Sequence, residues 1–444
     1  MKKKRLYLLS VVLLTICTLK AQNPFITDQF TADPTARVFE GRVYVYPSHD
    51  IPSPIDRLKE WFCMADYHVF SSDNMIDWTD HGVIVSQDSV PWIKPESYSM
   101  WAPDCVFRNG KYYFYFPSTL EASEKSAFAI GVAIADKPYG PFTPKSEPIK
   151  GVSGIDPCVF VDKDSQAYIY WCGQGNMYVA KLKDNMIELA SEPLILGGLP
   201  KGFKEGPFLF ERNNKYYYTF PWVQDKTETL AYAMGDNPLG PFEFKGLIME
   251  QWPSECWTNH HSIAEFKDQW YLFYHHNDYS PQFDKNRSIR IDSLFFNSDR
   301  TIQQVAPTLR GVGITDAKRK IQLDRYTRVS ENGATISFLK ENDKFAGWKM
   351  MFSLNGAWSQ YNAVDFGNQR LEKTKARVCS LKGGILEVRT GSPSGEIVAE
   401  IKVPSGNEWS VVESPLILKP TGVANLFMSL KGDNETAIDW ISFE

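Results

Sequence analysis

The sequence predicts an all-β chain in which a five-bladed β-propeller is followed by a β-sandwich domain. An aromatic hairpin motif occurs five times between residues 32 and 276, and no long amphipathic helix interrupts the series. After residue 320 the aromatic hairpins stop and a different pattern of alternating strands begins. With 444 residues and 43% apolar content, the chain is long enough for two domains with separate cores.

The first residues have the composition of an export signal. The stretch "MKKKRLYLLSVVLLTICTLKAQ" joins a basic head to an apolar run and places the small residue Ala21 where cleavage would occur. The apolar run is shorter than the ~20 residues that a spanning helix needs, and no second run of that length follows. We expect a signal peptide at residues 1–21 and an exported mature chain, periplasmic or extracellular, without a transmembrane segment. A membrane anchor and a lipid-modified Cys17 are the less favoured alternatives.

The five hairpins share one pattern. Each begins with a polar or acidic residue beside a small residue or Pro, alternates into apolar positions, turns at Gly, Asn or Asp, and returns as an aromatic strand. They read "ADPTARVFEGRVYVYPS", "APDCVFRNGKYYFYFPS", "IDPCVFVDKDSQAYIYW", "EGPFLFERNNKYYYTFPW" and "HHSIAEFKDQWYLFYHH". With further strands between the copies, the period is about 50 to 70 residues, which is typical of four-stranded propeller blades.

The heads of these hairpins carry the candidate site. The innermost strand of a blade starts beside the central channel, so residues at the heads of different hairpins are expected to meet in one pocket. Those residues are Asp33, Asp156, Glu205, His260 and His261. A turn-forming role explains a single Asp before Pro, but three acidic heads and a histidine pair favour a shared site.

Several carboxylates in one partly desolvated pocket have pKa values that are pushed apart, so that one acts as an acid and another as a base. Hydrolysis of a glycosidic bond requires that division of roles. Metal-assisted hydrolysis is the chemical rival, but no H-E-x-x-H spacing occurs, and only a lone structural cation beside His260 is expected.

Other residues near the strand ends are weaker candidates. The string "YPSHD" suggests a nucleophilic triad, but consecutive strand residues point to opposite faces. His49 and Asp50 are instead expected to border the pocket, because they end the strand that began at Asp33. Glu255 is expected at a turn or on the surface. Cys158 and Cys172 lie on two arms of one hairpin, and free thiols are favoured over a disulfide there.

Composition narrows the class of partner. A net charge of -5 without a basic stripe gives nucleic acid no electrostatic attraction. The 21 Tyr and 13 Trp suit both sheet packing, which must account for most of them, and stacking against sugar rings. The expected partner is a polysaccharide or oligosaccharide, with no organic cofactor; the oligomeric state is not predicted.

Residues 24 to about 315 closely resemble glycoside hydrolase family 43 through five stretches in order, including "ADPTARVFEGRVYVYPSHD", "MWAPDCVFRNGKYYFYFP" and "GIDPCVFVDKDSQAYIYW". The resemblance implies a five-bladed propeller and an inverting mechanism. Asp33 takes the place of the general base, Glu205 that of the general acid, and Asp156 that of the carboxylate that tunes the pKa of the acid. Inversion would need the base and acid ~6.5 to 9.5 Å apart.

The same resemblance implies further site features. Members often hold an axial calcium near the histidine that matches His260. An Arg of the last blade commonly contacts the acids, and "NRSIRID" offers Arg287 or Arg290 without choosing between them. Trp101 in "MWAP" is expected to line the pocket and stack on a sugar, with packing beneath the site as the alternative.

Residues from about 321 to 444 resemble a family 6 carbohydrate-binding module, a β-sandwich, through "YNAVDFG" and "DNETAIDWISFE". Such modules usually hold a structural calcium between an acidic first strand and a late Asp. Here "IQLD" stands where two Glu are usual, which leaves Gln322, Asp324 and Asp439 as the candidate ligands. Tyr361 and Trp409 are candidate sugar-stacking rings, although both fit a core.

We therefore predict a catalytic propeller at residues 22–319 and a carbohydrate-binding-like sandwich at 320–444. The expected function is an exported, inverting, exo-acting glycosidase that releases xylose or arabinofuranose from plant cell-wall polysaccharides or oligosaccharides. The loop "PSPIDRLKEWFCMADYH" is expected to wall off one end of the channel. The alternatives are a non-catalytic carbohydrate-binding protein, a galactan- or arabinan-cleaving member of the same family, and a retaining fructan-cleaving propeller, which would carry Asn-Asp-Pro-Asn where "TADPTA" stands.

Overall fold

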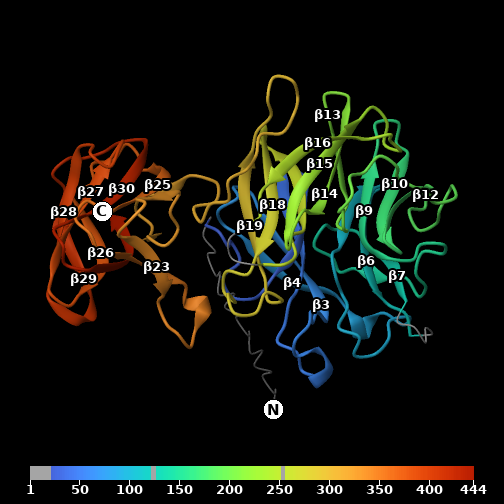
Figure 1. Ribbon diagram of the computed structural model, residues 1–444, viewed down its shortest axis with the longest axis horizontal. Coiled ribbons are helices and arrows are strands. Elements are labelled where there is room, and N and C mark those ends of the chain that lie inside the picture. Colours follow the sequence, from blue (N-terminus) through green and yellow to red (C-terminus); the bar gives the residue numbers. More distant parts are fainter. Residues whose placement is uncertain (1–21, 122–126, 252–255) are drawn as a thin grey trace, which may run out of the picture.

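The computed structural model describes residues 22–121, 127–251 and 256–444, which form two lobes joined side by side (Figure 1). The larger lobe is built from five sheets and the smaller from two. The helices among these residues are short 3-10 turns, η1 (Asp56–Leu58), η2 (Gln87–Ser89) and η3 (Lys344–Ala346). The prediction of an all-β propeller and sandwich is confirmed. The predicted signal peptide, residues 1–21, lies outside the described residues.

Each predicted hairpin supplies the first two strands of one blade, and every blade is an antiparallel meander. Blade one has β1 (Ala32–Phe39), β2 (Arg42–Ser48), β3 (Asp66–Ser72) and β4 (Thr79–Ser86). Blade two has β5 (Asp104–Arg108), β6 (Lys111–Thr119), β7 (Phe128–Ala135) and β8 (Thr143–Pro144). Blade three has β9 (Ile155–Val161), β10 (Ala167–Gly173), β11 (Asn176–Leu182) and β12 (Leu194–Ile195). Blade four has β13 (Phe208–Arg212), β14 (Lys215–Val223), β15 (Glu228–Gly235) and β16 (Glu243–Met249). Blade five has β17 (His261–Phe266), β18 (Gln269–His276) and β19 (Ser288–Leu294).

Tyrosines in the second strands explain much of the aromatic content. Each blade is covered on both faces, so these rings are buried, and a buried phenol needs a hydrogen-bond partner. The hydroxyls donate to backbone carbonyls further round the ring: Tyr46 to Pro138 at 2.5 Å, Tyr115 to Met186 at 2.8 Å, Tyr170 to Pro238 at 2.6 Å and Tyr217 to Arg300 at 2.7 Å. The repeated aromatic positions therefore bind one blade to the next.

The N-terminal segment closes the ring. Blade five has only three strands, and residues 23–31 run beside its last strand, β19. The amide of Phe25 donates to Ile289 O at 3.3 Å and that of Thr31 donates to Arg287 O at 2.9 Å. The Asn23 side chain is buried there and donates to Ile291 O at 2.9 Å. The first and last parts of the propeller are thereby joined.

The smaller lobe is a sandwich of two sheets. One sheet contains β20 (Thr315–Asp316), β22 (Arg328–Val329), β25 (Trp358–Asp365), β27 (Gly384–Thr390), β28 (Ile397–Val403) and β30 (Val423–Lys431). The other contains β21 (Ile321–Gln322), β23 (Ala334–Phe338), β24 (Trp348–Phe352), β26 (Lys373–Ser380), β29 (Gly406–Pro415) and β31 (Thr436–Phe443). Alternating apolar residues of both sheets fill one core between them. The predicted boundary at 319/320 falls between β20 and β21 and stays a prediction.

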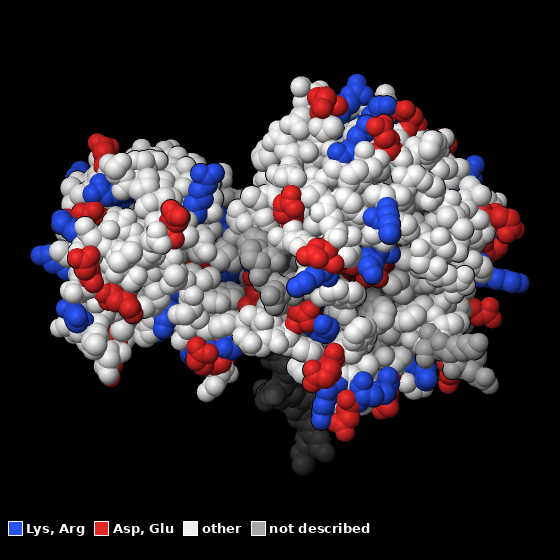
Figure 2. Space-filling model, viewed as in Figure 1, with Lys and Arg blue, Asp and Glu red and all other residues white. Residues whose placement is uncertain are grey.

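Polar and aromatic contacts join the lobes. Arg325 of the sandwich donates to the hydroxyl of Tyr279 at 2.9 Å, and the Tyr279 ring stacks on Trp348 with 4.9 Å between ring centres. A cavity of about 590 Å³ lies between the lobes, lined by Gln22, Tyr279, Lys320, Asp324, Arg377 and Trp440 among others. On the face shown in Figure 2, acidic and basic side chains are interspersed over both lobes.

Within the described part of the chain, no helix is long and apolar enough to cross a membrane. Cys158 and Cys172 are free buried thiols, as favoured from the sequence. The register explains why they do not bond: Cys158 lies opposite Tyr170, whereas Cys172 lies opposite Ile155.

Candidate active site

Two of the predicted acids stand on strained backbone at the heads of their hairpins. Asp33 and Asp156 have φ values of 47° and 56°, a left-handed conformation that few non-glycine residues adopt. Both precede a Pro, and the strand pairing shifts by a residue at both places. Such strain persists only where the surrounding structure enforces it, which is common at functional sites. The same local distortion therefore positions both carboxyl groups.

One cavity of about 140 Å³ contains all three predicted acids. It is lined by Asp33, Trp61, Phe62, Met64, Trp101, Ala102, Ile155, Asp156, Glu205, Glu228, Trp257, Thr258, Asn259, His260 and Arg287. These residues come from all five blade regions of the propeller, so the expected convergence at the channel is found. Trp101 lies where it was predicted, at the wall of the cavity. The lengthened loop between β2 and β3 contributes Trp61, Phe62 and Met64, which agrees with the expected wall.

Arg287 connects the acid of the first hairpin to a second, deeper carboxylate. Its Nη1 donates to Asp33 Oδ1 at 2.8 Å, while Nε and Nη2 donate to the two oxygens of Asp50 at 3.0 and 2.9 Å. All three side chains are buried. Because a bidentate pair fixes the guanidinium plane, Asp50 orients Arg287 toward Asp33.

Asp33 is held in its ionised form. Burial by itself raises the pKa of this carboxyl, but Arg287 and, less strongly, His260 and His275 lower it to about 2. The backbone amide of Asp33 also donates to His275 Nδ1 at 3.1 Å. Burial and Arg287 lower the pKa of His275 to about 3, so this imidazole is neutral and accepts that hydrogen bond.

The other acids of the cavity are held toward their protonated forms. Burial first, and then the charge of Asp33, raise the pKa of Glu205. Burial and the charge of Glu205 raise the pKa of Asp156 well above its ordinary value, against a hydrogen bond of 2.9 Å from the Gly206 amide to Asp156 Oδ2. The site thus contains an ionised carboxylate and a carboxyl pair that retains a proton, the combination that acid–base catalysis requires.

His260 is the residue of this cavity that is best suited to hold a cation. Burial lowers its pKa despite the nearby Asp33, so the ring is neutral and can act as a ligand. Two further wall residues carry buried oxygens without a hydrogen-bond partner among the described residues, Glu228 Oε1 and Asn259 Oδ1. Oxygen-rich surroundings of this kind fit the preference of Ca²⁺.

Three predicted pocket residues lie elsewhere. Arg290 is not at the cavity, because its Nε donates to Asp278 Oδ2 at 3.0 Å. His49 faces away from the acids and its Nδ1 contacts Asp66 Oδ1 at 2.7 Å. Asp50 is 1% exposed and contacts Arg287 rather than the cavity. None of these three residues lines the cavity and each is held in an ion pair, so the prediction that they contact substrate is corrected.

Glu228 is a cavity residue that the sequence argument missed. It begins β15, the third strand of its blade, and its Oε2 accepts a hydrogen bond of 2.7 Å from the Asn259 amide. Burial and Glu205 raise its pKa well above the ordinary value. No motif at a hairpin head marks it, and only the placement of the third strand reveals it. Glu255, the carboxylate named from the sequence, lies outside the described residues.

In the sandwich, the candidate calcium ligands are paired with arginines. Arg325 Nε lies 2.9 Å from Asp324 Oδ2, and Arg377 Nη1 lies 2.5 Å from Asp439 Oδ2. Asp324 Oδ2 is also buried without a hydrogen-bond partner among the described residues, so the calcium site expected at Asp324 and Asp439 stays a prediction. Tyr361 is not a sugar-stacking ring, because it is fully buried and donates to Leu323 O. The Trp409 ring is covered by the Arg377 guanidinium at 4.8 Å.

Comparisons with known proteins agree with this architecture. The chain is 38% identical over 334 residues to the Xylosidase/arabinosidase 43A of Humicola insolens. The aligned region covers 64% of this chain and 99% of that protein. The structure resembles CoXyl43, a GH43 beta-xylosidase/alpha-arabinofuranosidase from a compost microbial metagenome, solved in a calcium-free form in complex with xylotriose. The TM-score is 0.58 at 36% identity, and the match covers 64% of this chain and 97% of that one. It also resembles a family 43 arabinoxylan arabinofuranohydrolase from Bacillus subtilis in complex with cellotetraose (TM-score 0.55, 26% identity), over 96% of this chain and 99% of that one.

Family models match both lobes. Residues 330–444 match the carbohydrate binding module of family 6, as the sequence resemblance implied. Residues 21–302, more than half of the chain, match the model of the glycosyl hydrolases family 43. Since that segment contains the whole carboxylate cavity, the chain is a glycoside hydrolase that belongs to glycosyl hydrolase family 43.

Proposed function

We propose that this chain is an inverting, exo-acting glycosidase that releases pentose units, as a β-xylosidase, an α-L-arabinofuranosidase or both. The observation that supports it most is the opposite perturbation of two acids in one cavity, with the pKa of Asp33 lowered and that of Glu205 raised. The named activities of the relatives, xylosidase/arabinosidase and beta-xylosidase/alpha-arabinofuranosidase, support the choice of sugar.

In this proposal Glu205 is the general acid and Asp33 the general base. The Glu205 carboxyl gives its proton to the glycosidic oxygen as the bond between that oxygen and the anomeric carbon breaks. The Asp33 carboxylate takes a proton from a water whose oxygen bonds to the anomeric carbon from the opposite face. Solvent then returns the proton to Glu205 and removes the one on Asp33. The net reaction is the hydrolysis of one bond with inversion.

The remaining groups position these two acids. Asp156 shares a proton with Glu205, because the two carboxyls repel each other when both are ionised, and it is itself oriented by the Gly206 amide. Arg287, braced by Asp50, keeps Asp33 ionised. Glu228 Oε1, without a hydrogen-bond partner in the described part of the chain, is available to a sugar hydroxyl. Trp101 and the exposed ring of Trp61 supply flat surfaces for the sugar.

The small volume of the cavity supports action on chain ends. About 140 Å³ accommodates little more than one sugar ring, and the loop that carries Trp61 and Phe62 stands on one side of it. We propose a calcium ion at His260, which would add positive charge beside the acids when bound. We further propose that residues 1–21 direct export and that the sandwich, residues 320–444, holds the enzyme on polysaccharide.

Product configuration tests the function. The purified chain is incubated with xylo-oligosaccharides, arabino-oligosaccharides and aryl β-xyloside and α-arabinofuranoside, and the first product is followed by NMR. Release of single pentoses with inverted configuration is expected. Retention would overturn the mechanism, and release of internal fragments from arabinan or galactan would favour a different member of the family. Sugar binding without turnover would make the chain a carbohydrate-binding protein.

A further inference from the structure

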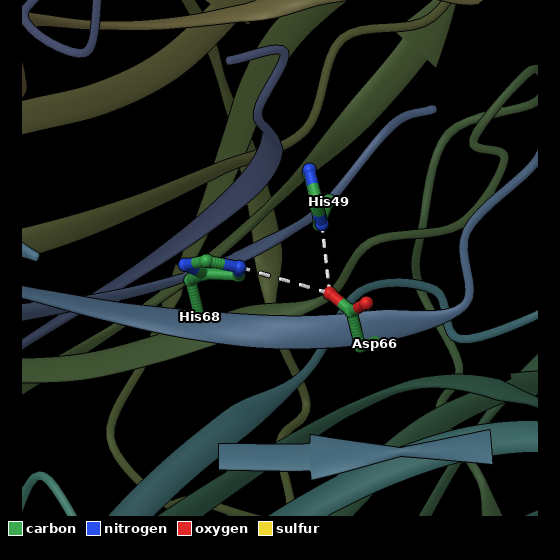
Figure 3. A group of neighbouring side chains, drawn as sticks. All are labelled: His49, Asp66 and His68. Atoms are coloured by element: carbon green, nitrogen blue, oxygen red, sulfur yellow. Dashed lines mark hydrogen bonds and ion pairs between the residues drawn. The ribbon is translucent and has the colours of Figure 1, made fainter. Parts of the chain in front are cut away.

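Two histidines and an aspartate meet at the base of the loop between β2 and β3, outside the carboxylate cavity. Asp66 and His68 belong to β3 and, being two residues apart, project from the same face of the strand. His49 directly follows β2, whose Ser48 pairs with Tyr67 of β3. Figure 3 shows the rings of His49 and His68 approaching one oxygen of Asp66.

The candidate ligand atoms lie close together, and one pair of them, His49 Nδ1 and Asp66 Oδ1, forms a hydrogen bond that a bound ion would replace. Asp66 Oδ1 lies 2.7 Å from His49 Nδ1 and 3.9 Å from His68 Nε2, and all three atoms lie within 4.8 Å of one another. The side chains are 14 to 21% exposed, so the cluster is enclosed but open to solvent on one side. Two imidazole nitrogens and one carboxylate oxygen are a common set for Zn²⁺ with a fourth position left for water.

A second carboxylate fixes the orientation of one histidine. His68 Nδ1 contacts Asp80 Oδ1 at 3.0 Å, and Nε2 lies on the side of Asp66. In the tautomer that donates from Nδ1 to Asp80, Nε2 has a lone pair for a metal ion. Asp80 is itself held by the Gly82 amide at 2.7 Å and by Gln29 Nε2 at 3.1 Å. A histidine that binds a metal through one nitrogen and donates to a carboxylate through the other is the usual arrangement around zinc.

The cluster brackets the loop that forms the cavity wall. His49 precedes that loop and Asp66 follows it, while the loop itself supplies Trp61, Phe62 and Met64. The Phe62 ring also lies 4.8 Å from the Arg287 guanidinium. A metal ion held by residues on both sides of the loop would fix its two ends together.

We propose that His49, Asp66 and His68 bind a divalent transition-metal ion of the zinc type, which clamps the base of this loop beside the active site. Two nitrogens among three ligands favour a zinc-type ion over Ca²⁺ and Mg²⁺, whereas the other groups near His260 are oxygens, and this separates the two sites.

The test uses the full mature chain without a histidine tag, freed of metal by a chelator. Addition of Co²⁺ is expected to give visible d–d absorption that saturates at one equivalent, and Zn²⁺ is expected to displace it. His49→Ala and His68→Ala should each weaken Co²⁺ binding at least tenfold, and Asp80→Asn should weaken it about 10- to 100-fold as an outer-shell change. His81→Ala, a histidine of the same blade that contacts Ser71 instead, is the matched control and should bind as the wild type does.

A second measurement tests the clamp. Trypsin should cleave the exposed Arg57 and Lys59 of the loop at least several-fold more slowly when Zn²⁺ is bound to the wild type, with no such protection in His68→Ala. Equal Co²⁺ spectra in wild type, His49→Ala and His68→Ala, or binding lost only in His260→Ala, would overturn the site. Metal binding without protection from trypsin would overturn the clamp.

Discussion

Asp33 and Asp104 both lie near the start of a first strand in neighbouring blades, yet they have opposite surroundings. Asp104 is enclosed by donors: Arg37 contacts both of its oxygens, the closer at 2.7 Å, and the Val159 amide donates to it at 2.6 Å. These contacts join the inner strands of blades one, two and three. Asp33 shares one arginine with Asp50 and lines an open cavity.

The order of residues around the proline accounts for this difference. In "ADPT" and "IDPC" the Asp precedes the Pro and has a positive φ, whereas in "APDC" the Asp follows the Pro. A shift of one residue in a strand turns a side chain to the other side. Asp33 and Asp156 therefore point into the cavity, and Asp104 points into the wall between blades. A carboxylate enclosed by its own partners stabilises the fold, while one left open is available for chemistry.

The largest expected effect is on turnover. Glu205→Gln and Asp33→Asn should each lower kcat/KM for xylo-oligosaccharides by about 10²- to 10⁴-fold, because each removes one proton-transfer group. Steady-state kinetics with the wild type as reference measure this, and circular dichroism checks the fold. For Glu205→Gln the loss should be smaller with an aryl glycoside, whose leaving group needs less protonation. An unchanged rate in either variant would remove its proposed role.

The next effect is on stability and concerns the enclosed acid. Asp104→Asn should lower the free energy of unfolding by about 3 to 5 kcal/mol, because it leaves the mostly covered Arg37 charge without its buried partner. Denaturant unfolding followed by tryptophan fluorescence measures it. Glu205→Gln is the matched control, and its stability should stay the same or rise, because it replaces a carboxyl whose ionisation burial and Asp33 disfavour. A Glu205→Gln variant less stable than Asp104→Asn would reverse the comparison.

The smallest expected effect is a shift in the pH dependence of kcat/KM. Asp156 and Glu205 repel each other when both are ionised, so the proton that this pair retains should be lost at a lower pH in Asp156→Asn. The general acid then loses its proton at a lower pH, and the basic limb of kcat/KM should move toward acid. The acidic limb should stay in place, because Arg287 remains the main partner of Asp33. Movement of the basic limb toward alkali would contradict the proposed role of Asp156.

Short sequence motifs mark most of the acidic residues of the site, but they do not mark all of its residues. The hairpin heads carry Asp33, Asp156 and Glu205 as visible motifs, and the repeat that carries them also predicts the propeller. Glu228 reaches the cavity from a third strand, where no repeat marks its role. The choice between Arg287 and Arg290 depended on strand position: Arg287 directly precedes β19, at the level of the cavity, whereas Arg290 lies within the strand beside Asp278.

In the sandwich, too, the sequence indicated the acidic residues but not the residues that pair with them. "IQLD" and "AIDW" correctly indicated that Asp324 and Asp439 belong to one region, because burial and the charge of Asp439 both raise the pKa of Asp324, to about 6. What the sequence did not reveal is that Arg325 and Arg377 approach them from a neighbouring position and from another strand. Partners that are distant in the chain, rather than the acids themselves, are the part that required the structure.

The join between residues 23–31 and β19 has a consequence for how the protein is made. A chain is synthesised from its N-terminus, so this segment is made first, before β19 and the loop beyond it. Until then the apolar face of blade one that packs against blade five is uncovered, and blades one to four form an open arc. Closure of the propeller therefore depends on completion of its fifth blade, and a nascent chain stalled before residue 287 would expose this apolar face to chaperones and proteases.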